Sequence, residues 1–322
     1  MIDKINKNVV SYITGFTDGE GCIEIHKRNL RLNIITGNTN LEILKRIKSI
    51  FKGEIYKQKK LLNYQYRKQS WSWHNNNRTN QKFFLETILP YSSVKRQQIL
   101  DALEFLKNIK SYHGGKGYND SITLEERKYR EMMYLKIQYP KHRIYTQEEI
   151  DEFQKQIDNT TQIQREFDED VYAYISGFVD AEGCVDTHLD KRSNNIYLRI
   201  SLINTYPKTL IMIKSVFGGN INLRKKSKNL NKRRSWNLEI QTKINVKFFL
   251  TKILPYSIVK KPQIELGLKF LETDNYQIKL LIAQELKKLK DEEYTEEQIE
   301  ELNEQIEDMN VDKLQHKLEE YK

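Results

Sequence analysis

The fold is decided by the stretch YITGFTDGEGC (12–22), which the chain repeats as YISGFVDAEGC (174–184). The two stretches are identical at eight of their eleven positions. A second block, KFFLETILPYSSVKRQQI (82–99), returns as KFFLTKILPYSIVKKPQI (247–264), with 13 of 18 positions identical. Two matching blocks in the same order indicate that one structural unit occurs twice, and a repeat of this kind determines the architecture.

Each copy has the pattern of one αββαββα unit. Residues 9–18 and 171–180 predict a helix, and alternating residues at 22–28 and 31–37 predict the strand pair that follows the first helix. We therefore expect an α+β fold in which two pseudo-symmetric αββαββα units form a saddle of antiparallel sheets. The other expected elements are helices at 41–51, 80–88, 95–109, 207–217, 245–253 and 260–272, and hairpins at 54–75 and 220–241.

Two unrepeated segments accompany the units. The first contains the stretch HGGKGYND and two helix starts with capping-box spacing, Thr123 with Glu126 and Thr146 with Glu149, so it is interpreted as a helical linker. The second is helical and acidic, and the sequence does not decide whether it packs on the units. The expected division is a first unit at 1–109, a charged linker at 110–168, a second unit at 169–275 and an acidic tail at 276–322.

The net charge of +10 is unevenly spread along the chain. Residues 285–322 hold 14 acidic and 6 basic side chains, so the preceding 284 residues carry +18. A body this basic favours a polyanionic partner, because contacts of Lys and Arg with phosphate dominate nucleic-acid affinity. Charge alone leaves a merely soluble basic protein as an equal alternative.

Cysteine usage and hydropathy bear on the compartment. With only Cys22 and Cys184, the chain is no secreted disulfide scaffold, and a reducing, intracellular setting is expected. No apolar run approaches the ~18 residues of a membrane span, and the start MIDKINKNVV is no signal peptide. We expect no membrane association; organelle, viral and microbial cytoplasm are not distinguished.

The repeated helix has a face of small residues, which lets two helix backbones approach closely. If the two copies pair, Glu20 and Glu182, just past the helix ends, become neighbours on a pseudo-two-fold axis. Two such carboxylates repel unless cations lie between them, which predicts a divalent-metal site suited to phosphodiester cleavage, one acid for each strand. The small-face residues are Ser11, Thr14, Gly15 and Asp18, and Ala173, Ser176, Gly177 and Asp180.

Two further repeated positions have structural interpretations. Gly21 and Gly183 are expected to allow backbone turns that are closed to other residues. For Asp18 and Asp180 we favour hydrogen bonds to loop amides at the helix end over a catalytic role.

The stretches YITGFTDGEG and YISGFVDAEG resemble the two signature helices of monomeric LAGLIDADG homing endonucleases. The similarity covers roughly residues 9–109 and 171–272, and it leaves the linker and the tail uncovered. It implies a site-specific endonuclease that makes metal-dependent double-strand breaks in a long DNA target, with a role in intron or intein mobility. The saddle of sheets would then be the DNA-binding surface.

The resemblance also assigns metal ligands. The family's metal-binding acid corresponds to Glu20 and Glu182, where many members have Asp, and the residue before it, which lends a backbone carbonyl, corresponds to Gly19 and Ala181. The implied cofactor is Mg²⁺, as two or three divalent ions between the paired glutamates.

Lysine and asparagine pairs complete the expected active site. Lys95 and Lys260 start a helix and correspond to the family's active-site lysines, which stabilise phosphate charge or help to activate water. Without the resemblance, a surface lysine that grips phosphate is an equal alternative. Asn38 and Asn204 follow the second strand, where relatives often carry a water-ordering side chain; a turn residue at a helix start is the slightly favoured alternative.

The hairpins carry the basic residues expected to bind DNA. Two-stranded ribbons fit the major groove, and alternate side chains on one face reach base edges. The tryptophans among them are interpreted as core. The expected DNA-binding residues are His26, Arg28, Arg31, Lys57, Lys59, Arg67, Lys68, Arg192, Arg199, Arg224, Lys226, Lys228, Lys232 and Arg234.

Three functions remain open from sequence. Site-specific cleavage of double-stranded DNA by a monomer with no obligate protein partner leads. The alternatives are a maturase that binds intron RNA and a DNA-binding regulator without catalysis. Retention of both glutamates and both lysines favours the enzyme, because a pure binder has no physical need for paired buried acids.

Overall fold

The computed structural model describes residues 5–59, 68–110, 122–142, 144–162, 166–190, 195–224, 234–291 and 296–320. It has the predicted α+β fold, with two αββαββα units that each end in a further helix. The first unit contains α1 (Lys7–Glu20), β1 (Gly21–Ile25), β2 (Leu32–Asn38), α2 (Leu41–Phe51), β3 (Glu54–Lys57), β4 (Trp71–Asn75), α3 (Arg78–Ile88) and α4 (Arg96–Asn108). The second contains α7 (Glu169–Glu182), β5 (Gly183–Asp190), β6 (Asn195–Asn204), α8 (Pro207–Phe217), β7 (Asn220–Leu223), β8 (Trp236–Ile240), α9 (Lys243–Ile253) and α10 (Lys261–Glu272).

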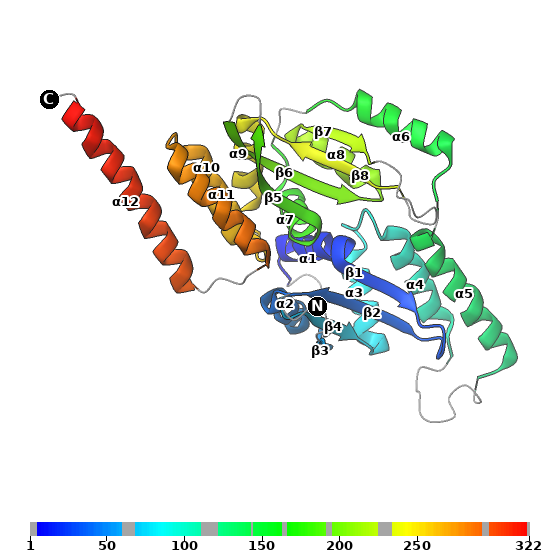
Figure 1. Cartoon of the computed structure of the whole chain (residues 1–322). Helices are drawn as coiled ribbons and strands as arrows, with labels where there is room; N and C mark the ends of the chain where they lie inside the picture. Colours follow the sequence, from blue (N-terminus) through cyan, green and yellow to red (C-terminus); the bar gives the residue numbers. More distant parts are fainter. Residues whose placement is uncertain are drawn as a thin grey trace.

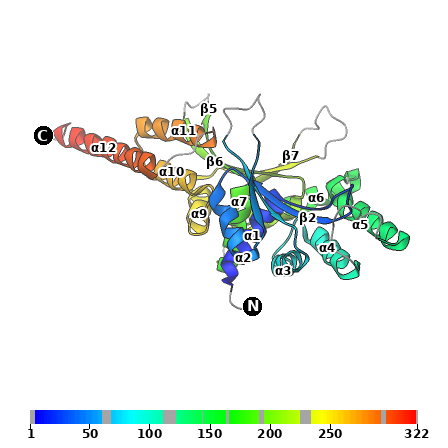
Figure 2. The same cartoon turned by 90° about the horizontal axis from the view of Figure 1, so that it is seen from below.

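Each unit builds one four-stranded antiparallel sheet. The strand orders are β1-β2-β4-β3 and β5-β6-β8-β7, so the two hairpins of a unit join through their second strands. Side chains alternate across each strand. In β2, Leu32, Ile34 and Thr36 are buried and the residues between them are not. Figure 2 shows α1, α3 and α9 below the strands, so the opposite face of the sheets is the saddle surface.

Two hydrophobic cores lie between the sheets and their helices. Trp73 belongs to the first core and Trp236 to the second, and both are fully buried. The indole nitrogen of Trp73 donates to the backbone oxygen of Lys52 at 2.6 Å. Each unit therefore folds around one buried tryptophan, as the core interpretation predicts for Trp73 and Trp236. The interpretation is wrong for Trp71, which is half-buried and lines a pocket between the two units.

The linker forms two helices that pack on different units. Helix α5 (Leu124–His142) contributes Met133 and Ile137 to the first core, and α6 (Gln147–Asn159) contributes Ile150 and Ile157 to the second. The predicted capping box at the start of α6 is present. The linker thus braces both units as it crosses between them (Figure 1).

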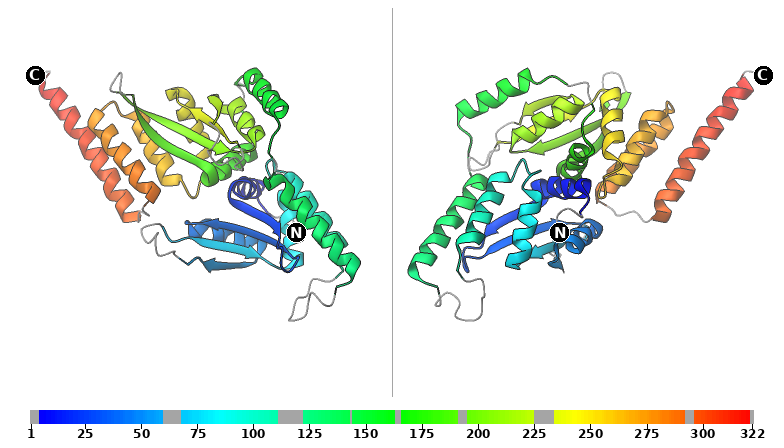
Figure 3. Two further views of the ribbon diagram at one scale, coloured as in Figure 1. Left: turned by 45° about the vertical axis from the view of Figure 1, so that its right-hand side comes forward. Right: turned by 180° about the vertical axis from the view of Figure 1, so that it is seen from behind.

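The tail also packs on the second unit. Helix α11 (Tyr276–Asp291) buries Ile278, Ile282 and Leu286 in the second core. Helix α12 (Glu296–Glu320) adds Leu302 and Ile306 to the same core. Figure 3 shows α12 along the outer side of α11, at the edge of the molecule. Both helices of the tail therefore pack on the second unit, which the sequence alone did not decide.

Two observations bear on the expected compartment. Across the described ranges, no helix combines the length and the apolar character that crossing a membrane requires. Cys22 and Cys184 are both free thiols.

Candidate active site

Helices α1 and α7 cross in the centre of the molecule, between the two sheets (Figure 1). A methyl group on Gly15 would lie 2.0 Å from the backbone oxygen of Tyr174, and one on Gly177 would lie 2.0 Å from that of Tyr12. Glycine is the only residue that lets the two backbones approach this closely. The contact predicted from the small-residue face is therefore confirmed.

The crossing brings the ends of the two helices together. A methyl group on Gly19 would lie 2.3 Å from the Cβ atom of Ala181. Glu20 and Glu182 are the last residues of α1 and α7, so they belong to the helices and do not follow them. The residues expected to lend carbonyls and carboxylates to a metal thus meet on the pseudo-two-fold axis.

The surroundings of Glu20 and Glu182 raise the pKa of both carboxyl groups. Loss of solvation and the nearby charge of Glu182 raise the pKa of Glu20 above the ordinary glutamate value. Loss of solvation also raises the pKa of Glu182, and the lysines Lys95 and Lys260 oppose the shift at both acids. Both side chains are nevertheless exposed, which corrects the expectation that they are buried. They are accessible to ions and to substrate.

Gly21 and Gly183 are needed for space and not for unusual backbone angles. Their φ values of −69° and −81° lie in extended backbone that any residue adopts. A Cβ atom would lie 2.6 Å from Cγ2 of Thr17 at the first glycine and 2.7 Å from Cγ1 of Val179 at the second. The predicted turn conformation is wrong, and the steric reason replaces it.

Asp18 and Asp180 hold the loops that carry the two lysines. In the first unit, Asp18 accepts hydrogen bonds from the amides of Ser93, Val94 and Lys95 at 2.8, 3.0 and 3.1 Å, and from the hydroxyl of Ser92 at 2.7 Å. Asp180 makes the equivalent set in the second unit, where it accepts from the hydroxyl of Ser257 and from the amides of Ile258, Val259 and Lys260. The structural role expected for this pair is confirmed.

The ammonium groups of the two lysines donate hydrogen bonds to the backbone oxygens of the same aspartates. Lys95 and Lys260 are the N-cap residues of α4 and α10. Nζ of Lys260 donates to the backbone oxygen of Asp180 at 2.5 Å, and Nζ of Lys95 donates to that of Asp18. Burial lowers the pKa of Lys260, while the surrounding carboxylates and the Cys184 thiol act to raise it.

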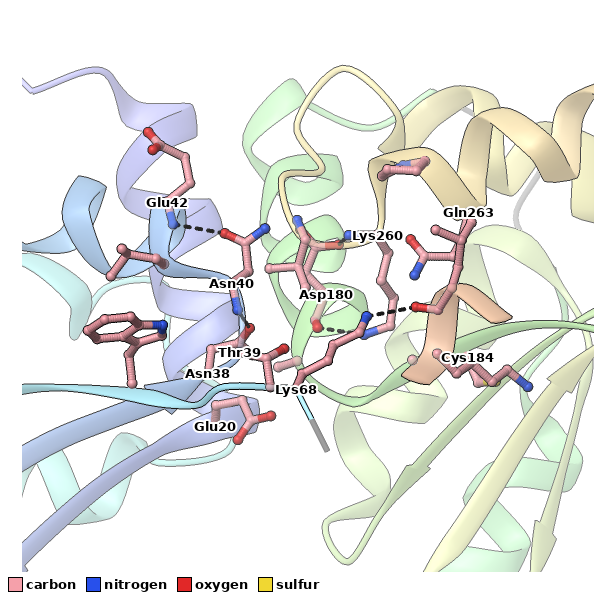
Figure 4. Close-up of a pocket in the computed structure, with 18 of the residues that line it drawn as sticks. Glu20, Asn38, Thr39, Asn40, Glu42, Lys68, Asp180, Cys184, Lys260 and Gln263 are labelled. Atoms are coloured by element: carbon pink, nitrogen blue, oxygen red, sulfur yellow. Dashed lines mark hydrogen bonds between the residues drawn. The ribbon is translucent and has the colours of Figure 1, made fainter. Parts of the chain in front are cut away.

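Two pockets flank the ends of the crossed helices, and each combines the two units. The first, of about 760 Å³, places Glu20 and Asn38 of the first unit with Ala181 and Lys260 of the second. Figure 4 shows Glu20, Asn38 and Lys260 around this pocket. Glu20 therefore shares a pocket with the lysine of the other unit.

The second pocket, of about 910 Å³, contains the equivalent residues with the two units exchanged. It places Glu182 and Asn204 of the second unit with Gly19 and Lys95 of the first. In agreement, Lys95 is the charge that opposes the raised pKa of Glu182 most strongly, and Lys260 is the one that does so at Glu20. The two pockets are related by the pseudo-two-fold axis.

Asn38 and Asn204 both line the pockets and form turns. The side-chain oxygen of Asn38 accepts from the amide of Asn40 at 2.8 Å, and that of Asn204 accepts from the amide of Tyr206 at 2.7 Å. Each bond fixes the start of the following helix, as the turn interpretation predicts. The same side chains lie in the pockets with the acids, so the two interpretations are compatible.

The described members of the expected DNA-binding set differ in their exposure. Lys57 lies 5.8 Å from the ring of Trp71. Arg31, Lys68, Arg199 and Arg234 are half-buried, whereas His26, Arg28, Lys57, Lys59 and Arg224 are exposed. Five predicted residues lie outside the described residues, namely Arg67, Arg192, Lys226, Lys228 and Lys232.

Two of the expected DNA-binding residues have protein partners. Arg199 lies 3.6 Å from Asp186 and 3.7 Å from Glu239, which are on the neighbouring strands of the second sheet. Lys68 donates to the backbone oxygen of Leu289 at 2.8 Å, so it ties α11 to the first unit (Figure 4).

Several residues of the pockets were not predicted. Leu289 and Lys290 of α11 border the first pocket. The second is bordered by linker residues, including Tyr139, Tyr145 and Phe153. These segments are unrepeated, so the comparison of the two copies contains no signal for them. Tyr12 and Tyr174 were also missed, although they are identical in the repeated stretch.

The donor set fits a hard divalent cation. Magnesium is usually bound by one or two carboxylates together with substrate phosphates and water, and not by an all-protein cage. Glu20 and Glu182 supply two adjacent, exposed carboxylates whose repulsion a cation relieves. No group of three or more His, Cys, Asp or Glu side chains able to hold a metal occurs among the residues that the structure describes.

Comparison with known proteins agrees with this geometry. The sequence profile of the family described as LAGLIDADG endonuclease matches residues 13–84 and 175–258, one match in each unit. No curated protein sequence matches the chain. The fold and the two profile matches define a protein of the two-motif LAGLIDADG class, and the chain belongs to the LAGLIDADG endonuclease family.

Solved structures of the same fold cover nearly the whole chain. The structure of the homing endonuclease I-GzeII in complex with its DNA target has a TM-score of 0.58 and 16% identity, and covers 91% of this chain and 99% of its own. For the meganuclease I-AabMI bound to uncleaved DNA, the values are 0.58, 17%, 90% and 100%. For I-SmaMI bound to uncleaved DNA target in the presence of calcium ions, they are 0.54, 17%, 95% and 99%.

Proposed function

We propose that the protein is a site-specific homing endonuclease that makes magnesium-dependent double-strand breaks in a long DNA target. The first unit (1–109) and the second (169–275) would each cover one half of the target. The protein would act as a monomer in a reducing, intracellular setting and promote the mobility of an intron or intein.

One observation carries this proposal. Each of the two pockets joins a glutamate of one unit to a lysine of the other, and the two pockets are related by the pseudo-two-fold axis. The two strands of DNA are themselves related by a local two-fold axis, so each pocket would face one scissile phosphate. A protein that only binds DNA has no need for this repeated combination.

Each side chain has a distinct role in the proposal. Glu20 and Glu182 would hold Mg²⁺ with the carbonyls of Gly19 and Ala181. The bound cations would activate water and stabilise the leaving oxygen. Lys260 and Lys95 would stabilise charge on the phosphate, and the lowered pKa of Lys260 would also help it to exchange a proton with water. Asn38 and Asn204 would order water in the pockets.

The DNA surface would be the saddle face of the two sheets. The basic hairpin residues would meet the phosphates and the base edges, as two-stranded ribbons do in the major groove. The related structures I-GzeII, I-SmaMI and I-AabMI were solved bound to DNA, which supports this choice of partner.

The proposal is tested by recovering the target and then removing the acids. The protein is incubated with a randomised DNA library and Mg²⁺, and the cleaved ends are sequenced. A supercoiled plasmid with the recovered target is then treated with wild type, Glu20→Gln and Glu182→Gln. The amide keeps the shape of each side chain and removes its charge, so cleavage should fall by orders of magnitude while binding without metal persists.

Glu42→Gln is the matched control, since Glu42 borders the same pocket as Glu20 and has no role in the proposed chemistry. It should cut the plasmid at the wild-type rate. If both acid variants also cut at that rate, these glutamates are not catalytic. If wild type binds DNA and never cuts it, a regulator is the better description. If it binds intron RNA and accelerates splicing without cutting DNA, the maturase alternative replaces the endonuclease.

A further inference from the structure

Two buried tyrosines connect the units across the helix crossing. The hydroxyl of Tyr12 donates to Oδ2 of Asp180 at 2.6 Å, and that of Tyr174 donates to Oδ2 of Asp18 at 2.8 Å. Both side chains are at most 5% exposed. Burial raises the pKa of each hydroxyl well above the ordinary tyrosine value, so both are donors at neutral pH.

Each tyrosine reaches the lysine of the opposite unit through one carboxylate. Asp180 accepts from Tyr12 and also from the backbone amide of Lys260 at 3.0 Å, and its own backbone oxygen accepts from Nζ of Lys260. Lys260 borders the pocket that contains Glu20, which lies on the same helix as Tyr12. The first unit therefore places the lysine that shares a pocket with its own glutamate.

An equivalent series of hydrogen bonds starts from Tyr174 in the second unit and ends at a lysine of the first. Tyr174 donates to Asp18, and Asp18 accepts from the amide of Lys95, which borders the pocket of Glu182. The two chains use different hydroxyls, different carboxylates and different lysines. Each can be disturbed without touching the other.

We propose that Tyr12 and Tyr174 are positioning residues for cleavage, each of which sets the lysine of one pocket and hence the rate at which one DNA strand is cut. This inference rests on the proposed endonuclease function. Neither tyrosine lines either of these two pockets in the described part of the chain, so each would act through its aspartate and the lysine loop and not by touching the substrate.

The loss of one tyrosine hydroxyl should slow cleavage only moderately, because each aspartate has other hydrogen-bond donors. Asp180 keeps four other donors when Tyr12 becomes Phe, so the loop remains attached but loses one charge-assisted hydrogen bond. Small displacements of a catalytic group slow a reaction strongly, and we expect a decrease on the order of tenfold for the affected strand.

The experiment measures the two strands separately. The recovered target carries a different fluorophore on each strand, and single-turnover cutting is followed with saturating protein. Tyr12→Phe should slow the strand that Lys260→Met slows more, and Tyr174→Phe should slow the strand that Lys95→Met slows more. The Tyr12→Phe/Tyr174→Phe double variant should slow both strands and return their ratio toward the wild-type value.

Tyr172→Phe is the matched control. Tyr172 is a buried tyrosine of α7 whose hydroxyl accepts from the backbone amide of Phe167 and does not reach either aspartate. It should lower the melting temperature as much as the other Phe variants do and leave the strand ratio unchanged. DNA affinity without metal should stay within about threefold of wild type for all three variants, because the saddle face is untouched.

Opposite strand biases in Tyr12→Phe and Tyr174→Phe support the inference. A wild-type strand ratio in both variants, or the same bias in both, would show that the tyrosines only stabilise the helix crossing and would overturn it. A wild-type protein that cuts no DNA would overturn the proposed function, and this inference with it. Cleavage by the wild-type protein distinguishes the two failures.

Discussion

Substitution Gly15→Ala tests whether the close crossing of α1 and α7 creates the active site. The added Cβ atom would lie 2.0 Å from the backbone oxygen of Tyr174 and 2.9 Å from the backbone nitrogen of Phe178. Both obstacles are backbone atoms of the partner helix, so no side-chain rotation relieves the clash. The helices must separate.

The magnitude follows from this geometry. Ordinary contact begins near 3.4 Å, so the helices must move apart by about 1.4 Å, which forfeits more than half of the dispersion energy of the facing atoms. Overpacking typically costs ~1–3 kcal/mol, with larger values where backbone must move. Alanine recovers ~1 kcal/mol of helix propensity. We expect a net loss of about 2 kcal/mol, or a decrease in melting temperature of roughly 4–8 °C.

The assay combines calorimetry with plasmid cleavage. The separation moves Glu20 and Glu182 apart, so Gly15→Ala should slow cleavage at a temperature where the variant is still folded. Gly37→Ala is the control, because its Cβ atom would meet only the backbone oxygen of Trp71, at 3.6 Å. It should change stability by no more than ~0.5 kcal/mol. A Gly15→Ala protein that melts at or above the wild-type temperature would refute the reasoning.

Three other predictions concern titration, the tail and salt. The pKa values of Glu20 and Glu182 are raised in the folded protein, so protonation of these two acids adds to the free energy of unfolding. This contribution is complete below about pH 4.3 and is lost as the pH rises through the raised values. In calorimetry with chelator, the Glu20→Gln/Glu182→Gln protein should therefore melt above wild type at pH 7 and together with it at pH 4; Mg²⁺ should stabilise only wild type at pH 7. Ile282→Ala should lower the free energy of unfolding by about 2–4 kcal/mol in denaturant titration, since α11 buries this side chain fully in the second core; an unchanged midpoint would contradict that packing. Affinity for the recovered target should fall by orders of magnitude between ~50 and ~200 mM salt, and a flat response in a filter-binding series would count against a phosphate-gripping saddle.

Repetition explains why much of the site could be predicted from sequence. Glu20 and Glu182 occupy the same place in two copies of one stretch, and the small face beside them has a steric meaning that needs no knowledge of the rest of the chain. The helix contact follows from these residues. Helix bounds were predicted less well, because α1 and α7 each extend two residues beyond both predicted ends.

The pairing of acids with lysines could not be predicted. Sequence order associates Glu20 with Lys95, since both lie in the first copy. The crossing of the helices exchanges these partners, so that Glu20 shares its pocket with Lys260. Local patterns do not contain this exchange, because it depends on how two complete units dock.

The ion pairs of Arg199 escaped prediction for a related reason. Asp186 lies opposite Arg199 in the β5–β6 register, and Glu239 comes from β8 on the other side. Strand registers bring these three side chains together from positions up to 53 residues apart. A basic residue on a strand therefore indicated a DNA contact, while the competing carboxylates were visible only in the folded sheet.

The unrepeated helices make the two pockets unequal, and this leads to a last prediction. The pocket of Glu20 is lined by four basic and three acidic side chains, whereas that of Glu182 is lined by three basic and four acidic ones. Lys290 of α11 accounts for part of the first set, and Glu149 and Glu152 of α6 for part of the second. A scissile phosphate should thus enter the first pocket more readily at low salt, where such charges are least screened. The strand slowed more by Lys260→Met should be cut first, and its lead should shrink as salt rises or when Glu149→Gln and Glu152→Gln are combined. Simultaneous cutting of both strands at ~50 mM salt would mean that the pocket walls do not influence the phosphates, and that the symmetric residues alone set both rates.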